Sequence, residues 1–197
     1  MRRVSVPLLR AGSSRLLQAG ILLFALLAVG GCGANRTTLV SPAYSIARNQ
    51  AVLPVLPFTN ILVPETFAES VFNDFIDTLN ESREKTGFLR ADIIKDDLSE
   101  VEKILTPAHV YLTGEIWSYL ENAGCCATEI RVKSRLRIQR VRSREVLWET
   151  EIPLESFFEH DNSTLSVERE KLAKRLSDEL SRQTIKAIQG AKRINLD

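Results

Sequence analysis

The chain has 197 residues, of which 26 are basic and 25 are acidic, so the formal net charge is only +1. Four of the basic residues fall within residues 1–31, which contain no acid, and the rest of the chain therefore holds 22 basic and 25 acidic side chains, net −3. This balance provides no global basic field and excludes nucleic acid as an expected partner. The length fits one domain that buries its own core.

Residues 1–31 have the pattern of a bacterial lipoprotein signal peptide. The first 20 residues carry four arginines, and an almost entirely aliphatic run follows at residues 21–29. This run is much shorter than the roughly 20 apolar residues that a membrane span requires. Small residues then precede Cys32, an order that resembles the lipobox, in which the cysteine is acylated and becomes the first residue of the mature protein. We therefore expect the membrane to be a partner, through lipid on Cys32.

The residue after this cysteine is Gly33 rather than Asp, which under the enterobacterial sorting rule favours the outer membrane over the inner membrane. We expect a lipid-anchored protein of the outer membrane that faces the periplasm. Residues 33–50 are polar and unpatterned, so residues 32–50 are predicted to be the lipidated N-terminus and a flexible tether. A single periplasmic domain is then expected at residues 51–197.

The domain opens with two short strands and a helix. Residues 51–56 and 88–94 are apolar runs that predict strands. Between them, Pro64 opens a helix whose apolar residues recur as one stripe, and Gly87 suits the C-terminal end of this helical region. A short helix is expected over residues 98–105.

Three longer strands and a final helix complete the pattern. Strand-like runs cover residues 108–120, 129–141 and 145–154, and the segments between them suit turns, which predicts an antiparallel meander. Residues 165–191 repeat apolar side chains at helical spacing. The order predicts an α/β (α+β) fold: a mixed sheet of about five strands, with a C-terminal antiparallel meander, covered by helices.

The middle strand of this meander alternates apolar side chains with cations. The basic row consists of Arg131, Lys133, Arg135 and Arg137. It is a candidate binding surface for lipid phosphates or an acidic protein partner. The acids of the next strand that share one face are Glu149, Glu151 and Glu155. Antiparallel pairing would place them across from the cations, and we favour this cross-strand ladder, because exposed opposite charges on neighbouring strands usually only solvate a face.

The first strand of the meander carries Trp117 and Tyr119, which alternate with aliphatic residues. Strict alternation along a strand places both aromatic rings on one face of the sheet. Outward-facing aromatics are predicted here, and they could mark an interface.

Cys125 and Cys126 are adjacent and are the only cysteines besides Cys32. In an oxidising compartment they are a candidate disulfide, although a bridge between neighbours needs a strained ring. A pair of small turn residues, bridged or capped, and a redox or intermolecular role both fit the pattern. Two thiols without further ligands at suitable spacing do not predict a zinc site.

The sequence predicts no catalytic residues, no cofactor and no metal site. The chain has two histidines, and none of the nucleophile, metalloprotease, phosphate-loop or dinucleotide motifs occurs. His109 is expected to be a packed or edge residue. Residues 159–161 are consecutive and cannot converge on one ion from a strand.

Four stretches carry a family resemblance: AVLPVLPFTN, VPETFAESVFNDFIDTL, HVYLTGEIWSY and RLRIQRVRSREVLWETEI. Together they resemble the periplasmic domain shared by curli-secretion lipoproteins, penicillin-binding-protein activator lipoproteins and the amino-terminal domain of TolB. The Asn, Gly and Trp of that pattern correspond to Asn60, Gly114 and Trp148. The resemblance implies a non-catalytic envelope lipoprotein that docks another protein.

These observations predict an outer-membrane-anchored lipoprotein that is not an enzyme. Its expected role is that of an adaptor or assembly component of an envelope complex, with another envelope protein as its partner. The alternative is a lipid- or substrate-binding auxiliary lipoprotein of an envelope transporter. A large apolar pocket between sheet and helices would favour this alternative, whereas a filled core would favour the adaptor.

Overall fold

The computed structural model describes residues 36–195 except 89, 96–98, 100, 101, 104, 107 and 108. The predicted signal peptide, Cys32 and Gly33 lie outside the described residues, as does half of the short helix expected over residues 98–105. None of the helices in the described part of the chain combines the length and the apolar character that crossing a bilayer demands.

The described residues form a seven-stranded mixed sheet in which β1, β8, β7, β6, β3 and β5 follow one another and β4 pairs with β6. Its strands are β1 (Thr37–Val40), β3 (Val52–Val55), β4 (Thr59–Asn60), β5 (Arg90–Ile93), β6 (Val110–Ala123), β7 (Ala127–Arg140) and β8 (Val146–Glu159). The strands β6, β7 and β8 form an antiparallel meander, and β3 pairs in parallel with β5 and β6. The predicted α/β (α+β) fold with its C-terminal meander is therefore confirmed.

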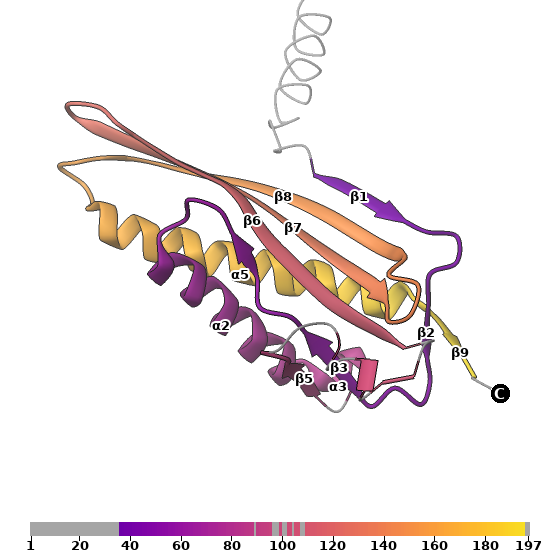
Figure 1. The fold of residues 1–197 in the computed structure, drawn as a ribbon. Coiled ribbons are helices and arrows are strands. Elements are labelled where there is room, and N and C mark those ends of the chain that lie inside the picture. The colour runs from indigo at the N-terminus through magenta and orange to yellow at the C-terminus, as the bar shows by residue number, and fades with distance from the viewer. Residues whose placement is uncertain are drawn as a thin grey trace, which may run out of the picture. The chain divides into compact units, whose positions relative to one another are not determined.

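Helices α2 (Glu65–Glu81) and α5 (Leu165–Gly190) lie side by side on one face of this sheet (Figure 1). The short helix α3 (Arg83–Thr86) follows α2, and a second, two-stranded sheet pairs β2 (Ser45–Ala47) with β9 (Lys192–Ile194). Gly87 ends α3 in the left-handed conformation, with φ of 73°, which a residue without Cβ adopts at no steric cost.

The core lies between the sheet and these two helices. The helices contribute the side chains of their apolar stripes, such as Phe75 of α2 and Leu176 of α5, both 0% exposed. The facing side of the meander contributes Ile116, Leu136 and Ile152, which are likewise 0% exposed. Each such side chain contributes about 1.5–3 kcal/mol by leaving water. The space between helices and sheet is thus filled by side chains.

The predicted tether is wrong for the residues from 36 onward. Strand β1 pairs antiparallel with β8, from Thr37 opposite Glu151 to Val40 opposite Trp148. Strand β2 pairs with β9 near the C-terminus, and the described residues from Arg36 onward belong to one compact unit. Sequence patterning missed β1 because a four-residue edge strand acquires its stability from the neighbouring strand rather than from its own composition.

Gln50, at the end of the predicted tether, is also part of the core. Its side chain is 2% exposed, and its amide bonds both backbone groups of Val110, donating to the carbonyl at 2.6 Å and accepting from the N–H at 2.9 Å. The amide thus acts as a substitute strand partner for the first residue of β6. A domain cut at residue 51 would leave those two backbone groups unpaired, which is costly in a buried position.

Glu168, in the first turns of α5, is a buried carboxylate surrounded by donors. The ammonium group of Lys171 lies 2.8 Å away, and the hydroxyls of Ser163 and Ser156 donate at 2.7 and 3.0 Å. The pKa of Glu168 is lowered from 4.5 to about 2. The hydrogen bond from Lys171 is the largest cause and that from Ser163 is the next, and together they outweigh burial, which raises the pKa. The charged form of Glu168 therefore stabilises the folded state.

We expect Glu168→Gln to lower the free energy of unfolding by about 2 kcal/mol at pH 7. Because the folded-state pKa is depressed, the contribution is fully present above about pH 4.5 and is lost as the pH falls toward about 2. Urea unfolding between pH 2 and pH 7 measures both effects. The exposed neighbour Glu170→Gln is the matched control, and an equal loss of stability there would contradict the assignment.

Candidate functional site

The basic row lies on the face of the sheet that α2 and α5 leave uncovered. The register between β7 and β8 places three cations of the basic row opposite acids, as expected for the cross-strand ladder. The pairs are Arg131 with Glu155, Arg135 with Glu151, and Arg137 with Glu149. The fourth cation, Lys133, is opposite Pro153.

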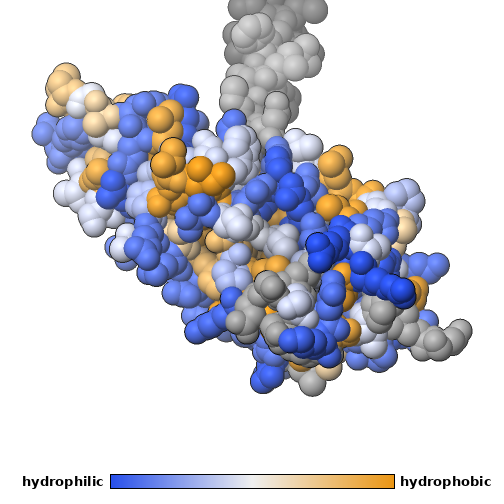
Figure 2. Space-filling model, viewed as in Figure 1, coloured by the Kyte–Doolittle hydropathy of each residue, from blue (hydrophilic) through white to orange (hydrophobic). Residues whose placement is uncertain are grey.

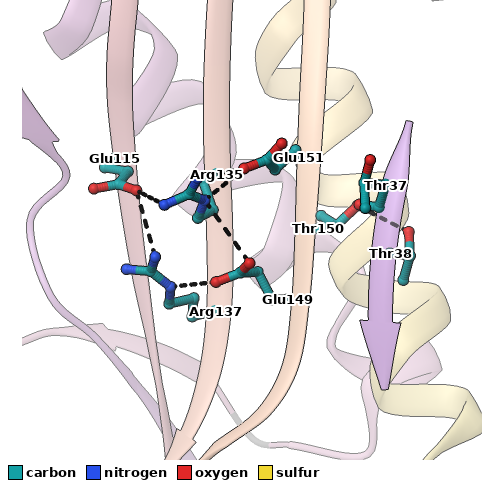
Figure 3. A network of polar contacts seen from close by, with 8 residues as sticks. All are labelled: Thr37, Thr38, Glu115, Arg135, Arg137, Glu149, Thr150 and Glu151. Carbon is teal, nitrogen blue, oxygen red and sulfur yellow. Dashed lines mark hydrogen bonds and ion pairs between the residues drawn. The ribbon is translucent and has the colours of Figure 1, made fainter. Parts of the chain in front are cut away.

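Arg135 and Arg137 form the centre of an ion-pair network that spans three strands (Figure 3). Nε of Arg135 donates to Glu151 at 2.9 Å, and its Nη1 donates to Glu115 of β6 at 2.8 Å. Nε of Arg137 donates to Glu149 at 2.5 Å, and its Nη2 lies 3.7 Å from Glu115. Glu115, which sequence reasoning did not connect to the basic row, thus bridges both arginines.

The positive charges of this network are neutralised within the domain. The side chains of Arg135 and Arg137 are only 26% and 30% exposed. The hydrogen bond with Glu151 is the main cause that raises the pKa of Arg135, against an opposing effect of burial. Two guanidinium groups face three carboxylates here, so the centre of the basic row presents no run of unpaired positive charge. This geometry supports the ladder, and partner binding by the basic row stays a prediction.

The other two cations of the basic row have local contacts. Nη2 of Arg131 lies 2.7 Å from Glu129 rather than bonding its cross-strand neighbour, because residues two apart on a strand share a face. The ammonium group of Lys133 stands 5.2 Å from the ring centre of Trp117, and the guanidinium of Arg135 stands 5.9 Å from the same ring. Cation–π contacts of this kind hold the indole in place.

Trp117 faces outward by the ordinary alternation of β6, as Glu115 does, and an irregularity changes the alternation after it. The register with β7 shifts between Ile116 and Ser118, so the alternation of side chains breaks there. Tyr119 consequently returns to the helix-covered face, where its ring meets Phe67 edge-on at 5.1 Å. The prediction of outward aromatics is correct for Trp117 and wrong for Tyr119.

An exposed apolar patch adjoins this tryptophan. It consists of Ile61, Leu62, Trp117 and Leu120, which are 64%, 93%, 37% and 47% exposed. The N–H of Ile61 donates to the carbonyl of Ile116 at 3.3 Å, which brings the loop after β4 beside β6. Figure 2 shows hydrophobic side chains gathered where this loop passes over β6. Leu62 also has φ of 56°, a left-handed conformation that costs energy for a residue with a bulky side chain.

Gly114 allows the loop before β4 to pack onto β6. A Cβ at this position would lie 2.5 Å from Cδ1 of Phe58 and 2.8 Å from Cδ2 of Leu136. The ring of Phe58 in turn meets Phe72 edge-on at 5.0 Å and lies 5.3 Å from Phe75. The glycine that the resemblance singles out is therefore the point where an aromatic cluster rests on the backbone of β6.

A hollow of about 280 Å³ opens between this loop and the ion-pair network. Its walls include Leu56, Pro57 and Thr59 on one side and Glu115, Arg135 and Arg137 on the other. Both arginines there already bond carboxylates, so the hollow offers few unpaired donors for a ligand. The hollow is open to solvent and its lining is mixed, which differs from an enclosed apolar ligand cavity.

Cys125 and Cys126 lie in the turn between β6 and β7, where both are exposed. Their sulfur atoms are 3.1 Å apart, longer than the roughly 2.05 Å of a disulfide bond, so the structure holds two free thiols. The contact with Cys125 is the main cause that raises the pKa of Cys126, which reduces its thiolate fraction at neutral pH. The redox state of the pair in the cell stays a prediction.

His109 and Glu121, which are of residue types that often act in catalysis, make contacts within the fold. His109 is 8% exposed, its Nε2 lies 3.4 Å from Oδ1 of Asn49, and burial lowers its pKa. Glu121 of β6 accepts two hydrogen bonds from Arg169 of α5, at 2.6 and 2.7 Å, which joins sheet and helix. Within the described residues, no three His, Cys, Asp or Glu side chains are grouped so that they could hold a metal ion.

Comparison with solved structures finds this fold in bacterial proteins. A dodecameric PelC from Paraburkholderia phytofirmans is 17% identical with a TM-score of 0.51, over 75% of this chain and 96% of that one. The protein XCC0632 from Xanthomonas campestris is 9% identical with a TM-score of 0.50, over 77% of this chain and 90% of that one. At these identities the similarity establishes the fold alone. No protein-family model and no curated protein matches the sequence.

Proposed function

We propose that this chain is a lipid-anchored protein of the bacterial envelope, attached through Cys32 to the outer membrane. It acts as a non-catalytic assembly component that docks another envelope protein. The observation that carries the docking role is the apolar patch, which is exposed on a domain whose core is already filled. Exposed apolar groups on a rigid sheet are typical of protein interfaces.

The conformation of the patch supports this role over a merely structural one. Leu62 is 93% exposed and left-handed, so its side chain gains nothing from burial while its backbone is strained. Trp117 is fixed by two cations rather than buried, which pre-organises a large aromatic surface at little entropic cost on binding. The filled core supports an adaptor rather than a carrier that encloses lipid or substrate.

We expect Cys32→Ser to abolish acylation and leave an uncleaved or soluble precursor, since the thiol is required for acylation and acylation precedes cleavage. Labelling with radioactive palmitate, followed by separation of membranes from soluble protein, measures the loss. Gly33→Asp tests the leaflet: under the enterobacterial rule it should move the protein to the inner membrane. Continued palmitate incorporation by the Cys32→Ser chain would contradict the anchor.

The docking role is tested by a photo-crosslinking amino acid at Leu62 in intact cells. We expect one discrete adduct, identified by mass spectrometry, that is absent when the same amino acid replaces exposed Asp77 on the opposite, helical side. Trp117→Ala should reduce this adduct at least fivefold. An adduct containing only this chain would identify a second copy as the partner. The absence of any adduct at position 62 would contradict docking by the patch.

A further inference from the structure

The two edge strands of the sheet differ in whether their outward backbone groups have partners among the described residues. At the β5 edge, the side-chain amide of Asn80 bonds both backbone groups of Ala91, accepting from its N–H at 2.8 Å and donating to its carbonyl at 3.3 Å. At the opposite edge, no described residue pairs with the outer side of β1, and Leu39 and Val40 are each 59% exposed. An apolar edge strand of this kind is an aggregation hazard unless something covers it.

The distance between this edge and the predicted anchor is short. Only residues 33–35 separate Cys32 from Arg36, the first described residue. A fully extended chain advances at most about 3.6 Å per residue, so the Cα atoms of residues 32 and 36 lie within about 14 Å of each other. The headgroup layer on each side of a bilayer is about 5–7 Å thick. A chain acylated at Cys32 must therefore hold the start of β1 near that layer.

Positive charge flanks the edge on the side of α5. The guanidinium of Arg175 reaches the carbonyl of Glu155 in β8 at 3.2 Å, and Arg36 binds Glu179 of α5 at 2.8 Å. The cations of this flank are Arg36, Lys171, Arg175 and Arg182. Two of the carboxylates among them, Glu168 and Glu179, have side chains only 11% and 10% exposed, whereas Asp178 of the same helix is 55% exposed and lies 3.7 Å from Lys174. An apolar strip rimmed by cations matches the chemistry of an anionic headgroup layer.

We propose that the β1 edge, with Leu39 and Val40 in its C-terminal half, rests in the headgroup layer of the membrane that carries the lipid anchor. This inference rests on the proposed acylation of Cys32. The domain is then held on the bilayer by its own surface, and the unpaired backbone groups of β1 meet headgroups and their water. The apolar patch beside Trp117 belongs to β6 and its neighbouring loop, three strands away from β1 in the sheet, and stays free for a protein partner.

The test places a fluorophore at Leu39→Cys in the acylated full chain, with Cys125→Ser and Cys126→Ser removing the other thiols. Vesicles contain phosphatidylglycerol, phosphatidylcholine and a nitroxide-labelled lipid that quenches at headgroup depth. We expect at least threefold stronger quenching at position 39 than for the same fluorophore at Asp77→Cys on α2. The same fluorophore at Val40→Cys should be quenched in the same way, which would show that the result does not arise from a local disturbance by the dye at position 39.

The decisive variant inserts a Gly/Ser segment of about 20 residues between Gly33 and Ala34, which gives the domain about 25 Å of slack. If the edge itself binds the membrane, quenching at position 39 survives the insertion and is at least twofold stronger with phosphatidylglycerol than without it. Quenching that falls to the level of Asp77→Cys would overturn the inference. Energy transfer between labelled chains without lipid quenching would also overturn it, in favour of a second copy on the β1 edge.

A separate measurement shows whether Cys32 is acylated at all. The mass of the N-terminal peptide reports acylation of Cys32 directly, whatever the fluorophore shows. An unacylated chain refutes the proposed attachment, whereas an acylated chain with an unquenched label at position 39 refutes only the docking of β1.

Discussion

Replacing Gly114 by alanine is expected to lower the free energy of unfolding by about 3 kcal/mol, at the upper end of overpacking costs. The added methyl group would overlap the ring of Phe58 and press on Leu136, whose side chain is fully buried. The ring is held by Phe72 and Phe75, so a shift would disturb the contact between α2 and the sheet. Urea unfolding followed by circular dichroism measures the loss.

Two variants separate this clash from a general effect of the substitution. Gly190→Ala, at the end of α5, adds the same methyl group where no atom lies within 4 Å, so the stability should stay level or rise by up to about 1 kcal/mol. Phe58→Leu should recover part of the stability of Gly114→Ala, because the two residues share one space. Purely additive losses in the double variant would show that the ring is not the obstacle.

Reversing both central cations of the basic row, Arg135→Glu with Arg137→Glu, is expected to lower the free energy of unfolding by about 2–3 kcal/mol. Individual exposed pairs contribute only about 0–1 kcal/mol. Here, however, five carboxylates would meet on three adjacent strands, including the bridging Glu115, and like charges across strands repel. The loss should shrink at high salt, which screens the repulsion, and a salt series of unfolding midpoints measures it.

Rescue by charge exchange identifies the ladder as the cause. Adding Glu149→Arg and Glu151→Arg restores opposite charges between β7 and β8, and adding Glu115→Gln removes the remaining repulsion from β6. We expect the free energy of unfolding to return to within about 1 kcal/mol of its original value. The matched control is Arg131→Glu at the 56% exposed end of the row, where a small change is expected. If crosslinking at Leu62 is lost in the reversed protein while its stability is unchanged, the basic row is itself a docking surface.

The long elements were predictable from the sequence because their signals are local. Helical spacing over residues 165–191 and strict alternation over residues 129–141 define α5 and β7 without knowledge of their neighbours. The ladder followed from the same alternation, since a tight turn fixes which residues of β7 and β8 face each other.

The parts that sequence reasoning missed depend on residues far apart in the chain. Glu115 joins the ladder only because β6 pairs with β7 on its other side, and the inward position of Tyr119 depends on an irregularity in that pairing. The short strand β1 has no pattern of its own. The apolar patch combines a strained loop at Leu62 with β6, and neither segment alone indicates an interface.

The pairing of β1 with β8 also bears on the order of folding. Thr38 and Thr150, which share a hydroxyl hydrogen bond, are 112 positions apart, whereas the hairpins of the meander close within a few residues. Contacts between distant segments form late, because closing a long loop costs entropy before any contact offsets it. In a chain exported from its N-terminus, as the proposed signal peptide implies, β1 would be translocated first but could pair only after β8 had followed. In an acylated chain β8 would therefore at first be an unpaired edge strand. The pairing of β1 with β8, beside the membrane, would be the last step in forming the sheet.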